Sequence, residues 1–144
     1  MIEQDTIKLL RECDAGIKMG VDSINEVIND IKDEDFKRIL MDCRDKHEKL
    51  KTELNELLDE YHDDGKEPNP MAKGMSWVKT NAKLAADKSD KTIAALMTDG
   101  CNMGVKSLNR YLNQYSAADE KSKNIAKRLC SLEEDLCKDI RTYL

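Results

Sequence analysis

The architecture follows from two matching stretches, GIKMGVDSIN at residues 16–25 and GCNMGVKSLN at residues 100–109. Gly, Met, Gly, Val, Ser and Asn coincide when one stretch is laid over the other, and Asn29 then lies over Asn113. Agreement of this kind indicates that a helical unit has been duplicated. Each stretch lies inside a longer region whose apolar residues recur every three or four positions, which is the spacing of an amphipathic helix.

The apolar spacing predicts four long helices. The first covers about 6–31, the second runs from about 34 to 61, the third covers about 91–115, and the fourth runs to the C-terminus. Their starts are assigned to Asp33, to Ser89 or Asp90, and to a capping box over 116–119. The turn at 32–33 is so short that the first two helices must form an antiparallel hairpin.

Polar, glycine and proline residues over 62–70 end the second helix. Asn69 as N-cap and Pro70 at the first helical position then predict a shorter helix over about 71–86, which we expect to lie as a strap across the bundle. The expected plan is one all-α domain over residues 1–144, with a hairpin at 6–61, a crossover at 62–89 and a second hairpin at 90–144.

Composition excludes several classes of protein. The net charge of −5 disfavours binding to a phosphate backbone, and no apolar run is long enough to span a membrane. The five cysteines are an odd number with no CxxC pair, so we expect reduced packing cysteines. The acidic N-terminus has no apolar signal segment. These features predict a cytoplasmic protein.

Four of the six glycines are paired at helical spacing, Gly16 with Gly20 and Gly100 with Gly104. Each glycine inside a helix costs roughly 0.5–1 kcal/mol relative to alanine, so something must offset the loss. The simpler interpretation is a close crossing of the first and third helices. The other is room for a bulky group, such as His47, Trp77 or a ligand.

His47 lies in an otherwise apolar stripe of the second helix. Counting from the turns places it roughly level with residues 17–20, and places Glu133 of the fourth helix near Cys101. One interpretation is a buried hydrogen bond between His47 and Glu133 that satisfies two polar groups in the core. The other is a remnant metal or small-ligand site, to which Asp14 and Asp99 could contribute further carboxylates.

Two hairpins related by duplication and joined by a long crossover resemble the ferritin-like superfamily. The pattern is most similar to an uncharacterised bacterial family that includes stress-associated proteins of the YciE and YciF kind. Local support comes from residues 9–16 and 97–104. The resemblance implies a di-iron site with Glu-x-x-His pairs. This chain has no such pair, because Arg44 stands three residues before His47.

We therefore expect a non-catalytic four-helix bundle with a binding, structural or stress-related role. No cofactor is expected; the sequence leaves the oligomeric state open between a monomer and a homodimer and does not identify a protein partner or small ligand. The alternative is a metal-binding or redox protein holding iron, manganese or zinc at His47, Glu133, Asp14 and Asp99. A third interpretation is a partner-binding adaptor that uses the strap and its Trp77.

Overall fold

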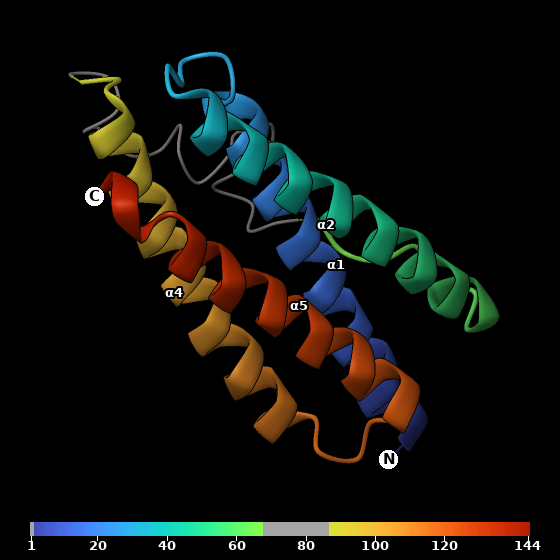
Figure 1. Cartoon of the computed structure of the whole chain (residues 1–144). Helices are drawn as coiled ribbons and strands as arrows, with labels where there is room; N and C mark the ends of the chain where they lie inside the picture. Colours follow the sequence, from blue (N-terminus) through green and yellow to red (C-terminus); the bar gives the residue numbers. More distant parts are fainter. Residues whose placement is uncertain (1, 68–86) are drawn as a thin grey trace.

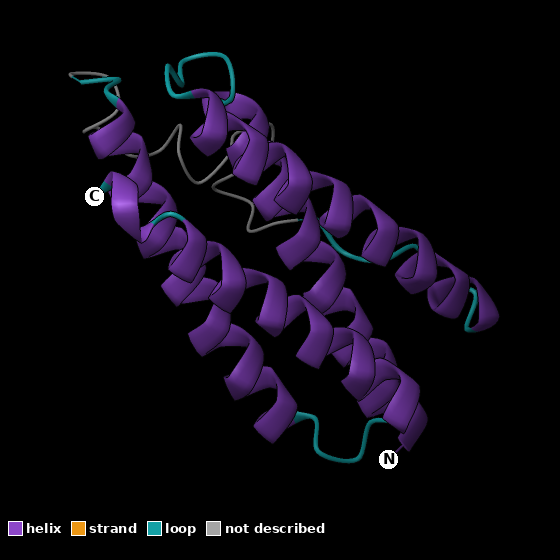
Figure 2. Cartoon of the chain, in the orientation of Figure 1, coloured by secondary structure: helices purple, strands orange, loops and turns teal. Residues whose placement is uncertain are grey.

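The computed structural model describes residues 2–67 and 87–144, and in this part of the chain the regular elements are all helices, joined by loops and turns (Figures 1 and 2). The four long helices and one short 3-10 helix are α1 (Ile2–Val27), α2 (Glu34–Glu60), α4 (Asp90–Gln114), α5 (Glu120–Asp139) and η2 (Arg141–Tyr143). The predicted all-α bundle of two hairpins is confirmed to this extent. The strap predicted over 71–86, with Trp77, lies outside the described residues.

Contacts at the two ends of the bundle fix the direction of each helix. At one end, the carboxylate of Asp90 accepts the backbone N–H groups of Lys32 and Asp33, both at 2.9 Å. At the other end, the backbone N–H of Asp119 donates to Thr6 Oγ1 at 2.8 Å. Helices α1 and α5 therefore run one way and α2 and α4 the other, so α2 ends and α4 begins at opposite ends of the bundle (Figure 1).

Two of the three predicted N-caps are confirmed. Asp33 accepts the N–H of Phe36 at 2.9 Å, and Ser89 accepts the N–H of Thr92 at 3.2 Å. The capping box expected to begin at residue 116 is wrong, because Asp119 itself is the N-cap of α5. Serine and aspartate both favour the N-cap position, so the sequence alone does not decide between Ser116 and Asp119 as the start of this helix.

The predicted end of the first helix at residue 31 is also wrong, because α1 ends at Val27. A turn follows, in which the N–H of Asp30 donates to Val27 O at 2.9 Å. Ile28 and Ile31 are nevertheless buried. The turn is packed into the core, so the apolar spacing continues past the point where the helical hydrogen bonds stop.

The core consists of two apolar clusters, one toward each end of the bundle. The cluster beside the α1–α2 turn contains Ile24, Val27, Phe36, Leu40, Ile93, Met97, Leu136 and Ile140. The cluster at the other end contains Leu9, Leu10, Ile17, Leu50, Leu54, Leu108, Ile125 and Leu129. Between them lies a polar layer, which we define as Gly20, His47, Gly104 and Glu133. In the described part of the chain, no helix is long and apolar enough to cross a membrane.

Candidate functional site

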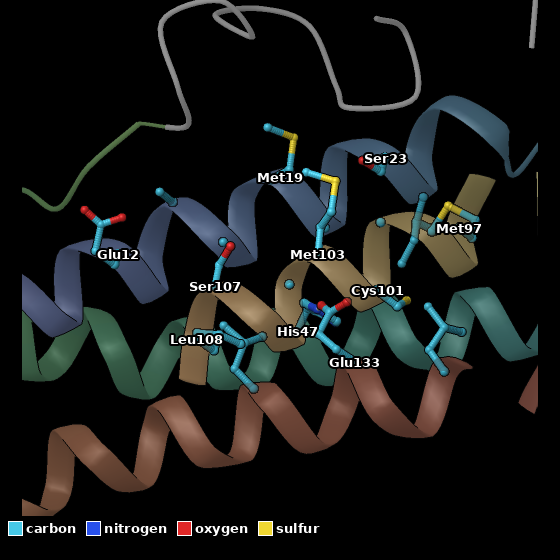
Figure 3. Close-up of a pocket in the computed structure, with 18 of the residues that line it drawn as sticks. Glu12, Met19, Ser23, His47, Met97, Cys101, Met103, Ser107, Leu108 and Glu133 are labelled. Atoms are coloured by element: carbon cyan, nitrogen blue, oxygen red, sulfur yellow. The ribbon is translucent and has the colours of Figure 1, made fainter. Parts of the chain in front are cut away.

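A half-enclosed cavity of about 440 Å³ opens at the polar layer. Helices α1 and α4 form its walls, and both glycine pairs, 16 with 20 and 100 with 104, line it. Its floor carries His47 from α2 and Glu133 from α5, whose side chains lie next to each other in Figure 3. The predicted meeting of the two duplicated stretches is therefore a meeting across a cavity.

His47 is held on both sides of its ring and is only 1% exposed. Its Nδ1 lies 2.8 Å from the backbone oxygen of Cys43, one helical turn earlier, and its Nε2 lies 2.9 Å from Glu133 Oε1. Both neighbouring oxygens are acceptors, so both ring nitrogens carry a proton and donate. The ring is therefore an imidazolium facing a carboxylate.

The electrostatics of the floor agree with this assignment. Burial alone would lower the pKa of His47, but the side chains of Cys43, whose Sγ lies 3.6 Å from Nδ1, and of Glu133 outweigh burial through hydrogen bonding and charge and raise the pKa from 6.5 to about 10. Burial, with the neighbouring charge of Glu133, raises the pKa of the Cys101 thiol well above its ordinary value. At neutral pH the raised pKa values keep His47 protonated and the Cys101 thiol neutral.

Gly20 and Gly104 fit around these two side chains, so these two glycines accommodate the ion pair rather than the predicted close crossing of the first and third helices. A Cβ added at Gly20 would lie 3.1 Å from His47 Nε2, and one at Gly104 would lie 3.4 Å from Glu133 Cγ. At Gly16 the added atom would meet, among the described residues, Leu129 at an ordinary 3.6 Å. The nearest atoms at all three positions belong to α2 or α5, because His47 and Glu133 occupy the space between the walls.

The cavity wall is mostly apolar, with a polar rim at one side. Its apolar residues include Met19, Ile24, Leu96, Met97, Met103, Leu108, Leu129 and Leu136. The ion pair of Glu12 with Lys66 and the side chain of Tyr111 supply polar groups on the lining. Sequence reasoning missed Met19 and Met103 as lining residues, although the repeat places one over the other and so carried the signal.

The other two carboxylates proposed from the sequence lie elsewhere. Asp14 is buried, receives Lys18 Nζ at 2.8 Å and accepts the backbone N–H of Lys66 at 3.0 Å. It thereby holds the segment after α2 against α1, and the positive φ of +83° at Gly65 brings that segment close to the carboxylate. Asp99 is exposed on α4. Of the four candidate ligands, the structure brings together His47 and Glu133.

Within the described residues, no group of three or more histidine, cysteine, aspartate or glutamate side chains is arranged to hold a metal ion. Most metal sites need three or four protein ligands. Here His47 offers a nitrogen only if it loses its proton and gives up its hydrogen bond to Glu133. Comparisons of the chain with protein-family models, with curated proteins and with solved structures gave no match.

Proposed function

We propose that this protein binds a small, mostly apolar molecule reversibly in the cavity between α1 and α4, without making or breaking a bond in it. The observation that carries the proposal is a 440 Å³ space at mid-bundle, where a packed core would ordinarily be filled by side chains. Ligand sites in bundles commonly lie between helices and combine apolar walls with a few polar groups. The walls and the floor described above have this composition.

Gly16 supports a ligand over a purely structural role for the glycines. Gly20 is needed by the ring of His47, which would lie too close to a methyl group. Gly16 has room for a methyl group, yet it carries none and lines the cavity. Because alanine would stabilise the helix by roughly 0.5–1 kcal/mol, packing against the described residues does not account for this glycine.

The chemistry of the floor supports binding rather than turnover. A general base needs a free lone pair at working pH, and both ring nitrogens of His47 carry protons. A nucleophilic cysteine needs a lowered pKa, whereas the pKa of Cys101 is raised. Neither group is activated for reaction.

The kinship with the ferritin-like superfamily is also a proposal. The parallel course of α2 and α4, with the end of one and the start of the other at opposite ends of the bundle, supports it. It concerns the fold, and it carries no di-iron chemistry to this chain because the Glu-x-x-His pairs are missing from the sequence. The metal-binding alternative, the stress-related role, the homodimer and the cytoplasmic location stay predictions.

The experiment uses 2-naphthol, a rigid probe smaller than the cavity, and isothermal titration calorimetry on the full chain. We expect saturable binding at one site per chain. Gly16→Leu should abolish it by filling the cavity without touching the ion pair, whereas Gly16→Ala should retain it. Unchanged binding by Gly16→Leu, or saturable uptake of iron, manganese or zinc with no binding of the probe, would contradict the proposal.

A further inference from the structure

We infer that the cavity selects an uncharged ligand whose polar head donates a hydrogen bond to the carboxylate of Glu133. This inference rests on the proposed binding function and names the chemical class of the ligand. It follows from three features of the floor and walls: which atom of Glu133 faces the cavity, how the charges are balanced, and where apolar surface surrounds them.

The first feature is that the two carboxylate oxygens of Glu133 have different surroundings. Oε1 accepts the hydrogen bond from His47 Nε2 at 2.9 Å. Oε2 would lie 3.5 Å from a Cβ placed at Gly104, so the missing side chain at residue 104 leaves it accessible from α4. Among the described residues, the Cys101 thiol also hydrogen-bonds to the carboxylate of Glu133, whose side chain is 13% exposed. A thiol is a weak donor and a carboxylate oxygen only accepts, so a ligand head that donates is the stronger partner for this group.

The second feature is that the charges on the lining cancel in pairs. The carboxylate of Glu133 faces the imidazolium of His47, and Glu12 faces Lys66. An anionic head placed on the floor would lie against the carboxylate, and a cationic head would lie near the imidazolium. Either would be partly removed from water without a partner of its own, which is unfavourable. A neutral head avoids this cost.

The third feature is that most of the lining besides the floor is apolar. In Figure 3, Leu108 and Met97 lie on either side of His47 and Glu133, whereas Met19 and Met103 lie farther from the pair and point away from it; none of the four side chains offers a strong hydrogen bond to a ligand head. The hydroxyl groups of Ser23 and Ser107 also line the cavity. A hydroxyl both donates and accepts, so these two residues do not discriminate between ligand heads. The discrimination therefore falls to Glu133.

The test compares naphthalenes that share one body and differ in the head: 2-naphthol donates, 2-methoxynaphthalene only accepts, and 2-naphthoate and 2-naphthylmethylammonium are charged. Calorimetry at pH 7 on the full chain gives each Kd. We expect 2-naphthol to bind about tenfold or more tightly than 2-methoxynaphthalene, because a hydrogen bond to a charged acceptor is worth that much. Both charged compounds should bind more weakly than 2-naphthol.

The variant Glu133→Gln presents an amide that can donate as well as accept, so the preference for 2-naphthol should fall to within a few-fold. If this variant does not fold, Glu133→Asp withdraws the carboxylate by one methylene and should reduce the same preference. The control Gly16→Leu should lose the uncharged ligands together, since it fills the space and leaves the head-group contact intact.

The outcomes separate this inference from the proposed function. Equal affinities for 2-naphthol and 2-methoxynaphthalene would overturn the inference and leave a cavity that binds apolar molecules without reading the head. Tighter binding of either charged compound would overturn the charge-balance argument and hence the inference. No binding of any of the four would overturn the proposed function itself.

Discussion

Two ion pairs join α2 to α5, and they differ most in their access to water. The pair of His47 with Glu133 has an N–O distance of 2.9 Å and side chains 1% and 13% exposed. The pair of Arg128 with Glu53 has a shorter distance of 2.6 Å and side chains 46% and 49% exposed. The first lies on the floor of the cavity, and the second lies on the outer surface of the same two helices.

The contrast teaches that the distance between charges does not set their importance to the fold. In water, two charges at close range gain little, because solvent screens them and their side chains lose freedom. In a buried layer the same attraction is larger, but both charges have lost their hydration. A buried pair is therefore costly to break and nearly neutral to replace as a whole. Four predictions test this contrast, in order from the largest expected effect on stability to the smallest.

The largest effect is expected from leaving one buried charge alone. Glu133→Leu strands the imidazolium of His47 and should lower the free energy of unfolding by about 3–5 kcal/mol. Adding His47→Leu to the same chain should recover most of that loss, since two leucines can join the neighbouring apolar clusters. Urea unfolding followed by circular dichroism measures both. A double variant as unstable as the single one would contradict the pairing.

An effect of similar size is a loss of stability as the pH rises. The pKa of His47 is about 10 in the folded protein and 6.5 ordinarily, so the folded state binds the extra proton between these values. The contribution of His47 to the free energy of unfolding should be fully present below about pH 6.5. It should fall by up to about 1.4 kcal/mol per pH unit toward pH 10.

The control for the pH dependence is His47→Gln, which cannot titrate. Buried thiols act in the same direction at high pH, because burial raises the pKa of Cys13 from 9.0 to about 12. The difference between the wild type and the variant therefore isolates His47. Parallel pH profiles for the two proteins would show that the imidazole is neutral in the fold.

A smaller effect separates two glycines on one face of α1. Gly20→Ala places a methyl group 3.1 Å from an imidazole that is held on both sides, and should destabilise the bundle by about 1–2 kcal/mol. Gly16→Ala meets, in the described part of the chain, Leu129 at 3.6 Å and should stabilise by up to about 1 kcal/mol through helix propensity. Thermal unfolding of the two variants should shift in opposite directions. Shifts of the same sign would contradict the assigned packing.

The smallest effect is expected at the exposed pair. A double-mutant cycle with Glu53→Gln and Arg128→Gln should give a coupling free energy of about 0.2–1 kcal/mol. The coupling should fall in 1 M salt, where the Debye length is about 3 Å. The same cycle at His47 and Glu133 should hardly respond to salt. Equal salt dependence at the two pairs would remove the contrast.

Sequence reasoning predicted the elements and the central pair, because both depend on local spacing. Helical spacing places His47 and Glu133 on inward faces, and counting from the turns places them at one level. Their hydrogen bond at 2.9 Å confirms that count. The repeat likewise predicted that the four glycines lie close together, and all four line the cavity.

Two features could not be predicted because they depend on tertiary geometry. The glycines looked alike in sequence, and only the position of the His47 ring distinguishes Gly20 from Gly16. In the sequence, Asp14 is a carboxylate near the site and available to a ligand. In the structure, the segment after α2 folds back, and the backbone N–H of Lys66 donates a hydrogen bond to Asp14. Such a return contact leaves no periodic signal in either partner.

The polar layer also constrains the register of the helices. Leucine and isoleucine side chains are interchangeable enough that an apolar seam tolerates sliding, whereas one donor and one acceptor meet at a single setting. A slip of α5 by one turn, about 5.4 Å, would carry the carboxylate out of reach of the ring and leave both charges stranded. The polar layer thus disfavours bundles with a shifted helix register, which packing of the flanking leucines alone would tolerate.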